Sequence, residues 1–324
     1  MEIQEILRAY EGDLKEVETI LDDNERSYVD LIPDISGYII RSGGKRLRPL
    51  LLMIASDLCG YGGERRYAIA AAIEFIHTAS LLHDDVIDHA DTRRGKKAAN
   101  RVWGNSATVL VGDYLYSRSF KMIIDDGDPR IQSLLSTTTL LMVEGETSQL
   151  IATGNLDITE EEYLSIIEKK TALLISAACA SGALLADLPD ASVNALGAFG
   201  RSLGNAFQVT DDILDYMGDE KEFGKAMGMD WKEGKITLPL IRALSACTPE
   251  ERDRVRALLG TADIAEDDLG EVISLIRTYG GIPYALDRAR DILSEGKAFL
   301  DGFPEGKAKT ALITLSDYIL KRKM

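Results

Sequence analysis

Two short groups of aspartates are the residues in this sequence best suited to chemistry. Both have the pattern Asp-Asp-x-x-Asp after an apolar run of helical spacing: Asp84, Asp85 and Asp88, and then Asp211, Asp212 and Asp215. Residues four positions apart share a helix face, so the outer two aspartates of each group point the same way. Carboxylates crowded on one or two turns need a cation. Oxygen ligands without histidine or cysteine favour Mg²⁺, which is commonly shared with substrate phosphates. We therefore expect two Mg²⁺-binding groups.

A solvated helix face is the alternative interpretation of one such group. Two copies that both follow apolar segments, instead of lying on polar faces, make this solvated-face interpretation weaker. A calcium loop is poorly supported, because neither group has the alternating ligands and central glycine of an EF-hand.

Positive charge is concentrated near these aspartates. The basic groups are Gly43-Gly44-Lys45-Arg46-Leu47-Arg48-Pro49, Arg93-Arg94-Gly95, Lys170-Thr171, and Lys225 with Lys235. Any single basic pair is usually part of an ordinary surface, but two of these groups lie directly beside the aspartates. The glycines also permit close backbone approach to a ligand. Together the groups favour the binding of one or two diphosphates.

The composition excludes several other classes of protein. The chain has 53 acidic and 37 basic residues and a formal charge of -16, which argues against nucleic-acid binding. Three widely separated cysteines form neither a disulfide framework nor a thiolate metal site, which indicates a reducing compartment. The first residues lack the features of a signal peptide, and residues 172–186 are too short and too polar to span a bilayer. We expect a cytoplasmic, soluble protein.

The elements that must position these groups are helices. Apolar residues recur at helical spacing, as in Leu196, Phe199 and Leu203, and no alternating β-branched run is present. Thr159 and Thr248 begin capping-box patterns. Residues 66–82 are apolar on almost every face of the expected helix, which indicates a buried helix. Residues 218–234 are expected to form a long surface loop. No linker divides the chain. We expect an all-α fold, a single helical-bundle domain over residues 1–324.

These residues resemble the trans-polyprenyl diphosphate synthase family, and octaprenyl-type enzymes most of all. The resemblance covers about residues 43–240. Its most specific part runs from Ile76-His77-Thr78-Ala79-Ser80-Leu81-Leu82-His83-Asp84-Asp85 to Arg93-Arg94-Gly95. Further matches are Gly112-Asp113-Tyr114-Leu115, Glu146 with Gln149, Lys170-Thr171, Gln208, Gly224-Lys225 and Glu233-Gly234-Lys235.

The resemblance implies a role for each group. Isopentenyl diphosphate would be held by Lys45, Arg48, His77 and Arg94. The allylic diphosphate would be held by Arg93, Lys170, Thr171, Gln208, Lys225 and Lys235. Mg²⁺ would bind Asp84, Asp88 and Asp211, with Asp85, Asp212 and Asp215 beside them. The resemblance also implies the type I isoprenoid synthase fold with an elongated hydrophobic cavity, a homodimer, and condensation by loss of the allylic diphosphate, attack by isopentenyl diphosphate and loss of a proton.

Chain length depends on the tunnel that, in this family, begins beside the first aspartate group. A bulky aromatic residue four or five positions before that group blocks the tunnel, and here those positions hold Ser80 and Ala79, which are small. A more distant floor would come from Tyr116, Phe120, Met122, Ile123 or Met142, each of which could equally be ordinary core. We expect a long all-trans product, most simply octaprenyl diphosphate (C40), serving as a quinone side chain and delivered to the membrane.

Three other functions share some of these features with a long-chain synthase. A geranylgeranyl (C20) or farnesyl diphosphate synthase differs only in its product. A terpene cyclase would not need a second diphosphate site. A noncatalytic subunit of a heteromeric synthase would be expected to have lost aspartates or the arginine pair, and this chain retains both.

Overall fold

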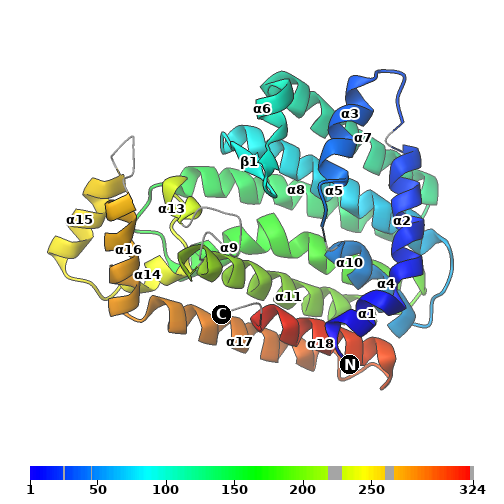
Figure 1. The fold of residues 1–324 in the computed structure, drawn as a ribbon. Helices are drawn as coiled ribbons and strands as arrows, with labels where there is room; N and C mark the ends of the chain where they lie inside the picture. Colours follow the sequence, from blue (N-terminus) through cyan, green and yellow to red (C-terminus); the bar gives the residue numbers. More distant parts are fainter. Residues whose placement is uncertain (25, 45, 218–227, 260–265, 322–324) are drawn as a thin grey trace. The chain divides into compact units, whose positions relative to one another are not determined.

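Helices make up nearly all of the regular structure of this chain (Figure 1). The computed structural model describes residues 1–24, 26–44, 46–217, 228–259 and 266–321. In chain order the elements are α1 (Ile3–Ala9), α2 (Glu11–Asn24), α3 (Leu31–Ile40), α4 (Leu47–Leu58), α5 (Arg65–Ile87), β1 (Thr92–Arg93), β2 (Lys96–Lys97), α6 (Ala99–Trp103), α7 (Asn105–Asp126), α8 (Pro129–Ala152), α9 (Glu160–Ile167), the π-helix η1 (Glu168–Ala172), α10 (Leu173–Leu185), α11 (Asp190–Met217), α13 (Met229–Lys232), α14 (Leu238–Leu244), α15 (Pro249–Leu259), α16 (Glu266–Thr278), α17 (Gly281–Ala298) and α18 (Lys307–Leu320). The predicted all-α class is confirmed. In the described part of the chain, no helix has the length and apolar character needed to cross a membrane.

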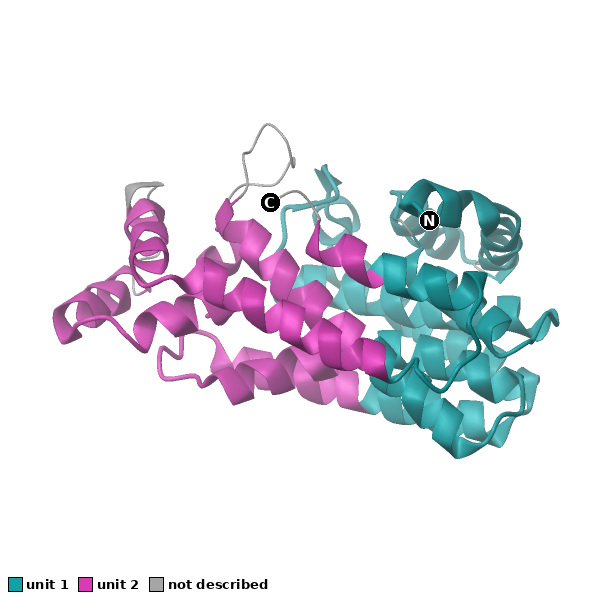
Figure 2. Cartoon of the chain, turned by 90° about the horizontal axis from the view of Figure 1, so that it is seen from below, with its two compact units in different colours: residues 1–140, 174–200, 299–315 teal, residues 141–173, 201–298, 316–324 magenta. Residues whose placement is uncertain are grey.

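The chain divides into two compact units (Figure 2). Unit 1 comprises residues 1–140, 174–200 and 299–315, and unit 2 comprises residues 141–173, 201–298 and 316–324. The first aspartate group belongs to unit 1 and the second to unit 2.

Helix α5 is the centre of unit 1. It packs against α2, α4 and α7, and a helix with neighbours on several sides must be apolar nearly all round. Ile69, Ile73 and Phe75 are fully buried, as the apolar run in the sequence predicted. Burial of each such side chain contributes about 1.5–3 kcal/mol. The core thus fixes the helix whose last turn carries the first aspartates.

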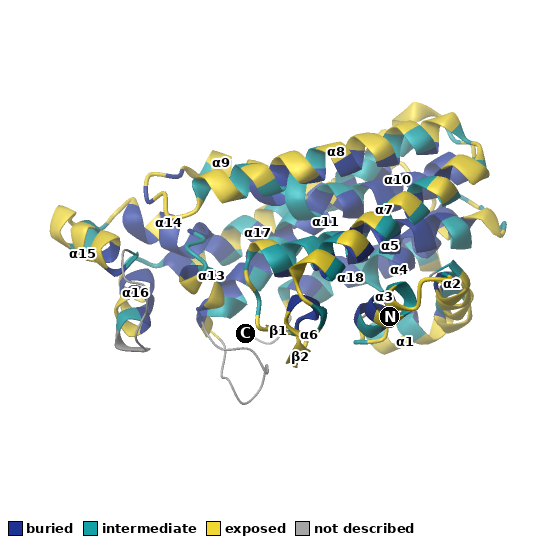
Figure 3. Ribbon diagram, turned by 90° about the horizontal axis from the view of Figure 1, so that it is seen from above, coloured by how far each residue is buried: buried dark blue, intermediate teal, exposed yellow. Residues whose placement is uncertain are grey.

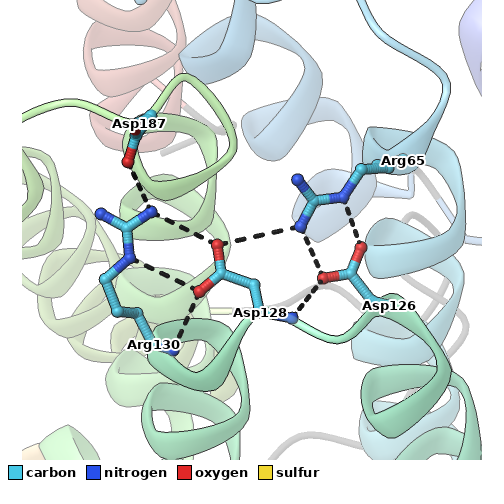
Figure 4. Close-up of polar contacts among 5 residues, drawn as sticks. All are labelled: Arg65, Asp126, Asp128, Arg130 and Asp187. Atoms are coloured by element: carbon cyan, nitrogen blue, oxygen red, sulfur yellow. Dashed lines mark hydrogen bonds and ion pairs between the residues drawn. The ribbon is translucent and has the colours of Figure 1, made fainter.

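A charged network ties the beginning of α5 to the end of α7 (Figure 4). Arg65 Nη2 lies 2.7 Å from Asp126 Oδ2, and Arg130 Nη2 lies 2.8 Å from Asp187 Oδ1. Asp128 lies between the two arginines, 3.8 Å from Arg65 and 3.3 Å from Arg130. Because Arg65 begins α5 and Asp126 ends α7, the two helices run antiparallel.

Unit 2 has its own core around α14, which packs against α16 and α17. The predicted capping boxes are confirmed at both helix starts. Thr159 N donates to Glu162 Oε2 at 2.8 Å, and Thr248 N donates to Glu251 Oε2 at 2.8 Å. These short-range bonds need only the spacing Thr-x-x-Glu, which is why the sequence alone predicts them.

Two features differ from the sequence-based expectation. A two-residue hairpin, β1 with β2, forms at Thr92–Arg93 and Lys96–Lys97, where no strand was predicted. The predicted long loop contains the short helix α13 at Met229–Lys232, while residues 218–227 lie outside the described residues. Elements this short depend on tertiary contacts and leave little periodicity in a sequence.

Candidate functional site

The first aspartate group lies at the C-terminal end of α5. Asp84 and Asp85 are in its last turn and Asp88 is the C-cap residue. Asp84 and Asp88 are half-buried, whereas Asp85 is completely buried. The predicted shared face of the outer pair is therefore observed, and the middle residue points into the protein.

Asp85 is held by two groups from the segment that follows α5. Its Oδ1 accepts a hydrogen bond from Arg93 Nε, and its backbone oxygen accepts one from Asn100 Nδ2 at 2.9 Å. Burial raises the pKa of Asp85, and the Arg93 guanidinium opposes that rise. Asp85 Oδ2 is buried without a hydrogen-bond partner among the described residues.

The β1–β2 hairpin presents the arginine pair. Arg94 and Gly95 occupy its turn with φ of 51° and 75°, the left-handed region that glycine tolerates best. Tyr38 anchors the hairpin, because its hydroxyl donates to Lys97 O at 2.9 Å. A Cβ added to Gly44 would lie 3.2 Å from Arg94 Nη1, so this glycine permits the close approach that the sequence suggested.

His77 and Arg48 belong to the same positive region of unit 1. Burial lowers the pKa of His77 well below its ordinary value, and Arg48, Arg94, Arg93 and Arg46 lower it further. Arg48 Nε is buried and has no hydrogen-bond partner among the described residues. An anion could supply the missing acceptor. Lys45, the remaining predicted ligand here, lies outside the described residues.

The predicted tunnel residues of unit 1 lie on α5 and α7, which pack side by side. Ala79 and Ile123 are buried; Ser80, Tyr116, Phe120 and Met122 are half-buried. Tyr116 and His83 have ring centroids 5.6 Å apart, and His83 directly precedes Asp84 in the sequence. Tyr116 thus lies at the level of the aspartates, and Phe120 one turn farther along α7. Met142 is buried in unit 2.

The second aspartate group lies in the last two turns of α11. Asp211 and Asp215 are half-buried and Asp212 is buried, the same division as in the first group. Both carboxylate oxygens of Asp212 accept hydrogen bonds: Oδ2 from the Tyr163 hydroxyl at 2.6 Å and Oδ1 from Gln208 Nε2 at 2.8 Å. Burial raises the pKa of Asp212 to about 6, and Asp211 and Asp215 contribute to the rise.

A hydrogen-bonded chain extends from Asp212 to the π-helix η1. Gln208 Oε1 accepts from the Thr171 hydroxyl at 2.9 Å, and Lys170 Nζ lies 2.7 Å from Glu146 Oε2. Glycine allows the neighbouring helices to approach η1 closely: a Cβ on Gly145 would lie 2.8 Å from Lys170 N. The π turn, a feature often found at functional sites, therefore places Lys170 and Thr171 beside the second aspartate group.

Asp215 binds the beginning of α13 instead of pointing only to solvent. Its two carboxylate oxygens accept from Met229 N at 3.1 Å and Asp230 N at 3.0 Å. Lys235 N donates to Asp230 O at 2.8 Å, and its Nζ lies 2.6 Å from Glu233 Oε2. Lys225, predicted to act with Lys235, lies outside the described residues.

The donors of both groups suit a hard divalent cation. The outer residues supply carboxylate oxygens, the ligand type that hard cations prefer. Within the described residues, no three His, Cys, Asp or Glu side chains are gathered closely enough to hold a metal ion by themselves.

Three buried residues that support the basic and aspartate groups were not predicted from the sequence. They are Glu74, Tyr163 and Asp230. Burial raises the pKa of Asp230 well above its usual value, and Asp212 and Asp215 raise it further. Glu74 interrupts an apolar segment at a buried position, and an isolated charged residue there is the signal that could have identified it. Tyr163 follows three glutamates and leaves no such signal.

Comparison with known proteins identifies the family. A model of the polyprenyl synthetase family matches residues 29–276. The chain belongs to the polyprenyl synthetase family. It is 38% identical to the octaprenyl diphosphate synthase of Escherichia coli, with 99% of each chain covered. It is also 35% identical to a short chain isoprenyl diphosphate synthase of Methanothermobacter thermautotrophicus, covering 100% of this chain and 99% of that one.

Solved structures agree with this assignment. A polyprenyl synthase from Caulobacter crescentus, complexed with calcium and isoprenyl diphosphate, matches with a TM-score of 0.95 and 38% identity, covering 100% of this chain and 98% of that one. A decaprenyl diphosphate synthase from Rhodobacter capsulatus matches with a TM-score of 0.93 and 37% identity, covering 98% of each chain. The chain is therefore a prenyl-transferring enzyme with the helical fold of this family.

Proposed function

We propose that this enzyme condenses isopentenyl diphosphate with an allylic diphosphate, repeatedly, to make a long all-trans polyprenyl diphosphate. One observation carries the proposal. Each aspartate group keeps its outer carboxylates half-buried, while protein partners hold the middle carboxylate inside. This arrangement suits the capture of diphosphates through metal.

Mg²⁺ is the proposed metal, and Asp84, Asp88, Asp211 and Asp215 its proposed ligands. The bound ion would supply a positive charge that stabilises the diphosphate as it leaves the allylic carbon. Asp85 and Asp212, which the sequence grouped with the ligands, make hydrogen bonds that orient the neighbouring turns. The calcium found with the Caulobacter enzyme supports a divalent metal.

The basic residues hold the two diphosphates in this proposal. Arg48, His77 and Arg94 (with Lys45) bind isopentenyl diphosphate, and His77 acts as a neutral donor because its pKa is lowered. Lys170, Thr171 and Gln208, with Arg93, Lys235 and Lys225, bind the allylic diphosphate. The apolar walls of α5 and α7 exclude water from the carbocation, and the departing diphosphate accepts the proton that condensation releases.

A long product, octaprenyl diphosphate in the simplest case, is supported by the small residues beside the first aspartate group. Ser80 is small and half-buried and Ala79 is small and buried, so no aromatic ring from α5 fills the space next to Tyr116. The similarity to the E. coli octaprenyl enzyme supports the same conclusion. Relatives with short products show why the chain length needs a direct experiment.

The experiment is a product assay. Radiolabelled isopentenyl diphosphate, an allylic primer and Mg²⁺ should yield a product near C40, and EDTA should abolish its formation. Ser80→Phe should shorten the product by closing the space beside Tyr116. Wild-type products that stop at C15 or C20 would contradict the long-chain proposal, and metal-independent turnover would contradict the metal role.

A homodimer is also proposed. Exposed positions occur along α7 and α8 (Figure 3). Among them, Leu110 and Ile124 of α7 are 68% and 63% accessible, and Leu150 and Ile151 of α8 are 63% and 79% accessible. Exposed apolar residues in such numbers are typical of association surfaces. Light scattering after gel filtration should give twice the mass of one chain. A monomer at micromolar concentration would contradict the proposal.

A further inference from the structure

Glu74 is a buried carboxylate in the middle of the apolar α5 helix. Only 4% of the residue is exposed. Burying an unpaired carboxylate is strongly unfavourable, so such a residue needs a compensating partner. The partner is Arg46, whose Nη1 donates to Glu74 Oε1 at 2.9 Å.

Arg46 itself is held in an unusual conformation. Its φ is 46°, in the left-handed region, which is unfavourable for a residue other than glycine. Its Nη2 donates to Ile40 O at 2.8 Å, so one guanidinium connects the end of α3, the start of α4 and the middle of α5. The backbone of Arg46 leads directly to Arg48, two residues later. The ion pair therefore determines where α4 begins and where Arg48 lies.

The charge of Glu74 reaches beyond its direct partner. The pKa of Arg48 is lowered to about 10, mainly by burial and also by Arg94, whereas Glu74 raises it. The pKa of Arg94 is likewise lowered by burial, Arg46 and Arg93, and raised by Glu74. His77 follows Glu74 by three residues, on the same side of α5. One carboxylate is thus the shared counter-charge of a cluster of arginines that would otherwise repel one another.

We propose that Glu74, through its ion pair with Arg46, is a positioning residue that holds Arg48, Arg94 and His77 ready for the diphosphate of isopentenyl diphosphate. Glu74 does not touch the substrate. The inference rests on the proposed function, which assigns that diphosphate to Arg48, His77 and Arg94. It adds that the site is assembled before the anion arrives, because the protein supplies its own buried negative charge.

Coulomb attraction alone predicts the opposite effect of removing this carboxylate. Taking a negative charge away from an anion site should strengthen anion binding. A positioning role predicts weaker binding, because the arginines then repel one another and lose the geometry that a diphosphate needs. The sign of the change therefore distinguishes the two explanations.

The test is steady-state kinetics of the full-length, Mg²⁺-loaded enzyme carrying Glu74→Gln. The substitution keeps the side-chain shape and a hydrogen-bond acceptor for Arg46 but removes the charge. We expect the KM for isopentenyl diphosphate to rise about ten-fold, while kcat and the KM for the allylic primer change less than about two-fold. An unchanged or lower KM for isopentenyl diphosphate, or an equal rise in both KM values, would overturn the proposal.

Glu18→Gln is the matched control. Glu18 Oε1 lies 3.6 Å from the Nε of the same arginine, but its side chain is 56% exposed. A solvated carboxylate at that distance contributes little, so this variant should retain the wild-type KM for both substrates. A rise equal to that of Glu74→Gln would show that any carboxylate near Arg46 has the same effect, and would overturn the special role of the buried one.

Two further variants make the result decisive. Glu74→Asp keeps the charge but withdraws it by one methylene from Arg46, and should raise the KM for isopentenyl diphosphate about three-fold even if Glu74→Gln does not fold. A wild-type KM for Glu74→Asp would overturn the proposal. Arg48→Ala tests the proposed isopentenyl diphosphate site itself. If the KM of this variant for isopentenyl diphosphate did not rise, the proposed function would be refuted. A rise in the KM of Arg48→Ala, with no rise for the Glu74 variants, would refute only the positioning role of Glu74.

Discussion

The two aspartate groups share a sequence pattern but are supported by different chemistry. In the first, the buried middle residue, Asp85, accepts a hydrogen bond from a cation, Arg93. In the second, the buried middle residue, Asp212, accepts hydrogen bonds from two neutral groups, Tyr163 and Gln208. The same spacing thus produces a charge-compensated support in one place and a neutral hydrogen-bonded support in the other.

This difference shows what the repeated motif specifies. Helix geometry places the outer two aspartates within about 40° of each other and turns the middle aspartate about 100° from the first and about 60° from the last. How that buried carboxylate is then stabilised depends on the segments packed against it. The first support depends on a hairpin next in sequence, and the second on the more distant α9.

The largest expected effect on turnover follows from the loss of one outer carboxylate in either aspartate group. Asp84→Ala and Asp211→Ala should each reduce kcat at least about 100-fold, because each removes a ligand that acts on the departing diphosphate. Incorporation of radiolabelled isopentenyl diphosphate measures this. Asp125→Asn and Asp253→Asn, on exposed surface aspartates, are the controls and should keep wild-type turnover. Turnover that survives in only one of the two variants would show that the groups are not equivalent in function.

The middle aspartates should differ in their effect on stability. Asp85→Asn leaves Arg93 without its charged partner and should lower the free energy of unfolding by about 2–3 kcal/mol. Asp212→Asn should change it by less than about 1 kcal/mol, because a buried amide is less costly than a buried carboxylate and two neutral neighbours can still bond to it. Urea unfolding in EDTA compares them. Equal losses would remove the distinction between charged and neutral support.

Loss of the Tyr163 hydroxyl should have a smaller effect. Tyr163→Phe removes one of the two donors to Asp212 and should lower stability by about 1 kcal/mol. The KM for the allylic primer should rise a few-fold, with the KM for isopentenyl diphosphate unchanged, because the hydrogen-bonded chain ends at Thr171. Tyr284→Phe, on a half-buried tyrosine bonded to Glu160, is a suitable control. A change confined to isopentenyl diphosphate would contradict the assignment of this network.

The smallest expected effect is a dependence of stability on pH that comes from unit 1. All three histidines of the chain lie between residues 77 and 89. The pKa of His77 is lower in the folded protein than in the unfolded chain, so the unfolded state binds the extra proton. The contribution of His77 to stability should therefore fall as pH decreases through about 6.5, by less than about 1 kcal/mol between pH 7 and pH 6, whereas the raised pKa of Asp212 contributes with the opposite sign. His77→Gln should remove this part of the pH dependence, measured as the shift in urea midpoint. If the pH dependence of the urea midpoint were the same in His77→Gln as in the wild type, it would come from groups other than His77.

Much of the fold could be predicted from the sequence because it depends on short-range periodicity. The apolar run of α5, the buried stripe of α11 and the two capping boxes are confirmed. The β1–β2 hairpin and α13 were missed, because neither is long enough to show a period. A single domain over the whole chain and a homodimer stay predictions, as do the metal and diphosphate roles of the individual residues.

The sequence by itself determined the family, the all-helical class and the two aspartate groups, since residue type and spacing on a helix are local properties. Only the tertiary structure decided which aspartate of each group is buried and what supports it. It also revealed Glu74 with Arg46, and Tyr163 with Asp212. These pairs join residues 28 and 49 positions apart, and no periodic pattern links side chains at such separations. Their partnership arises because a charge or hydroxyl withdrawn from water must find a partner, and packing alone determines which one is within reach.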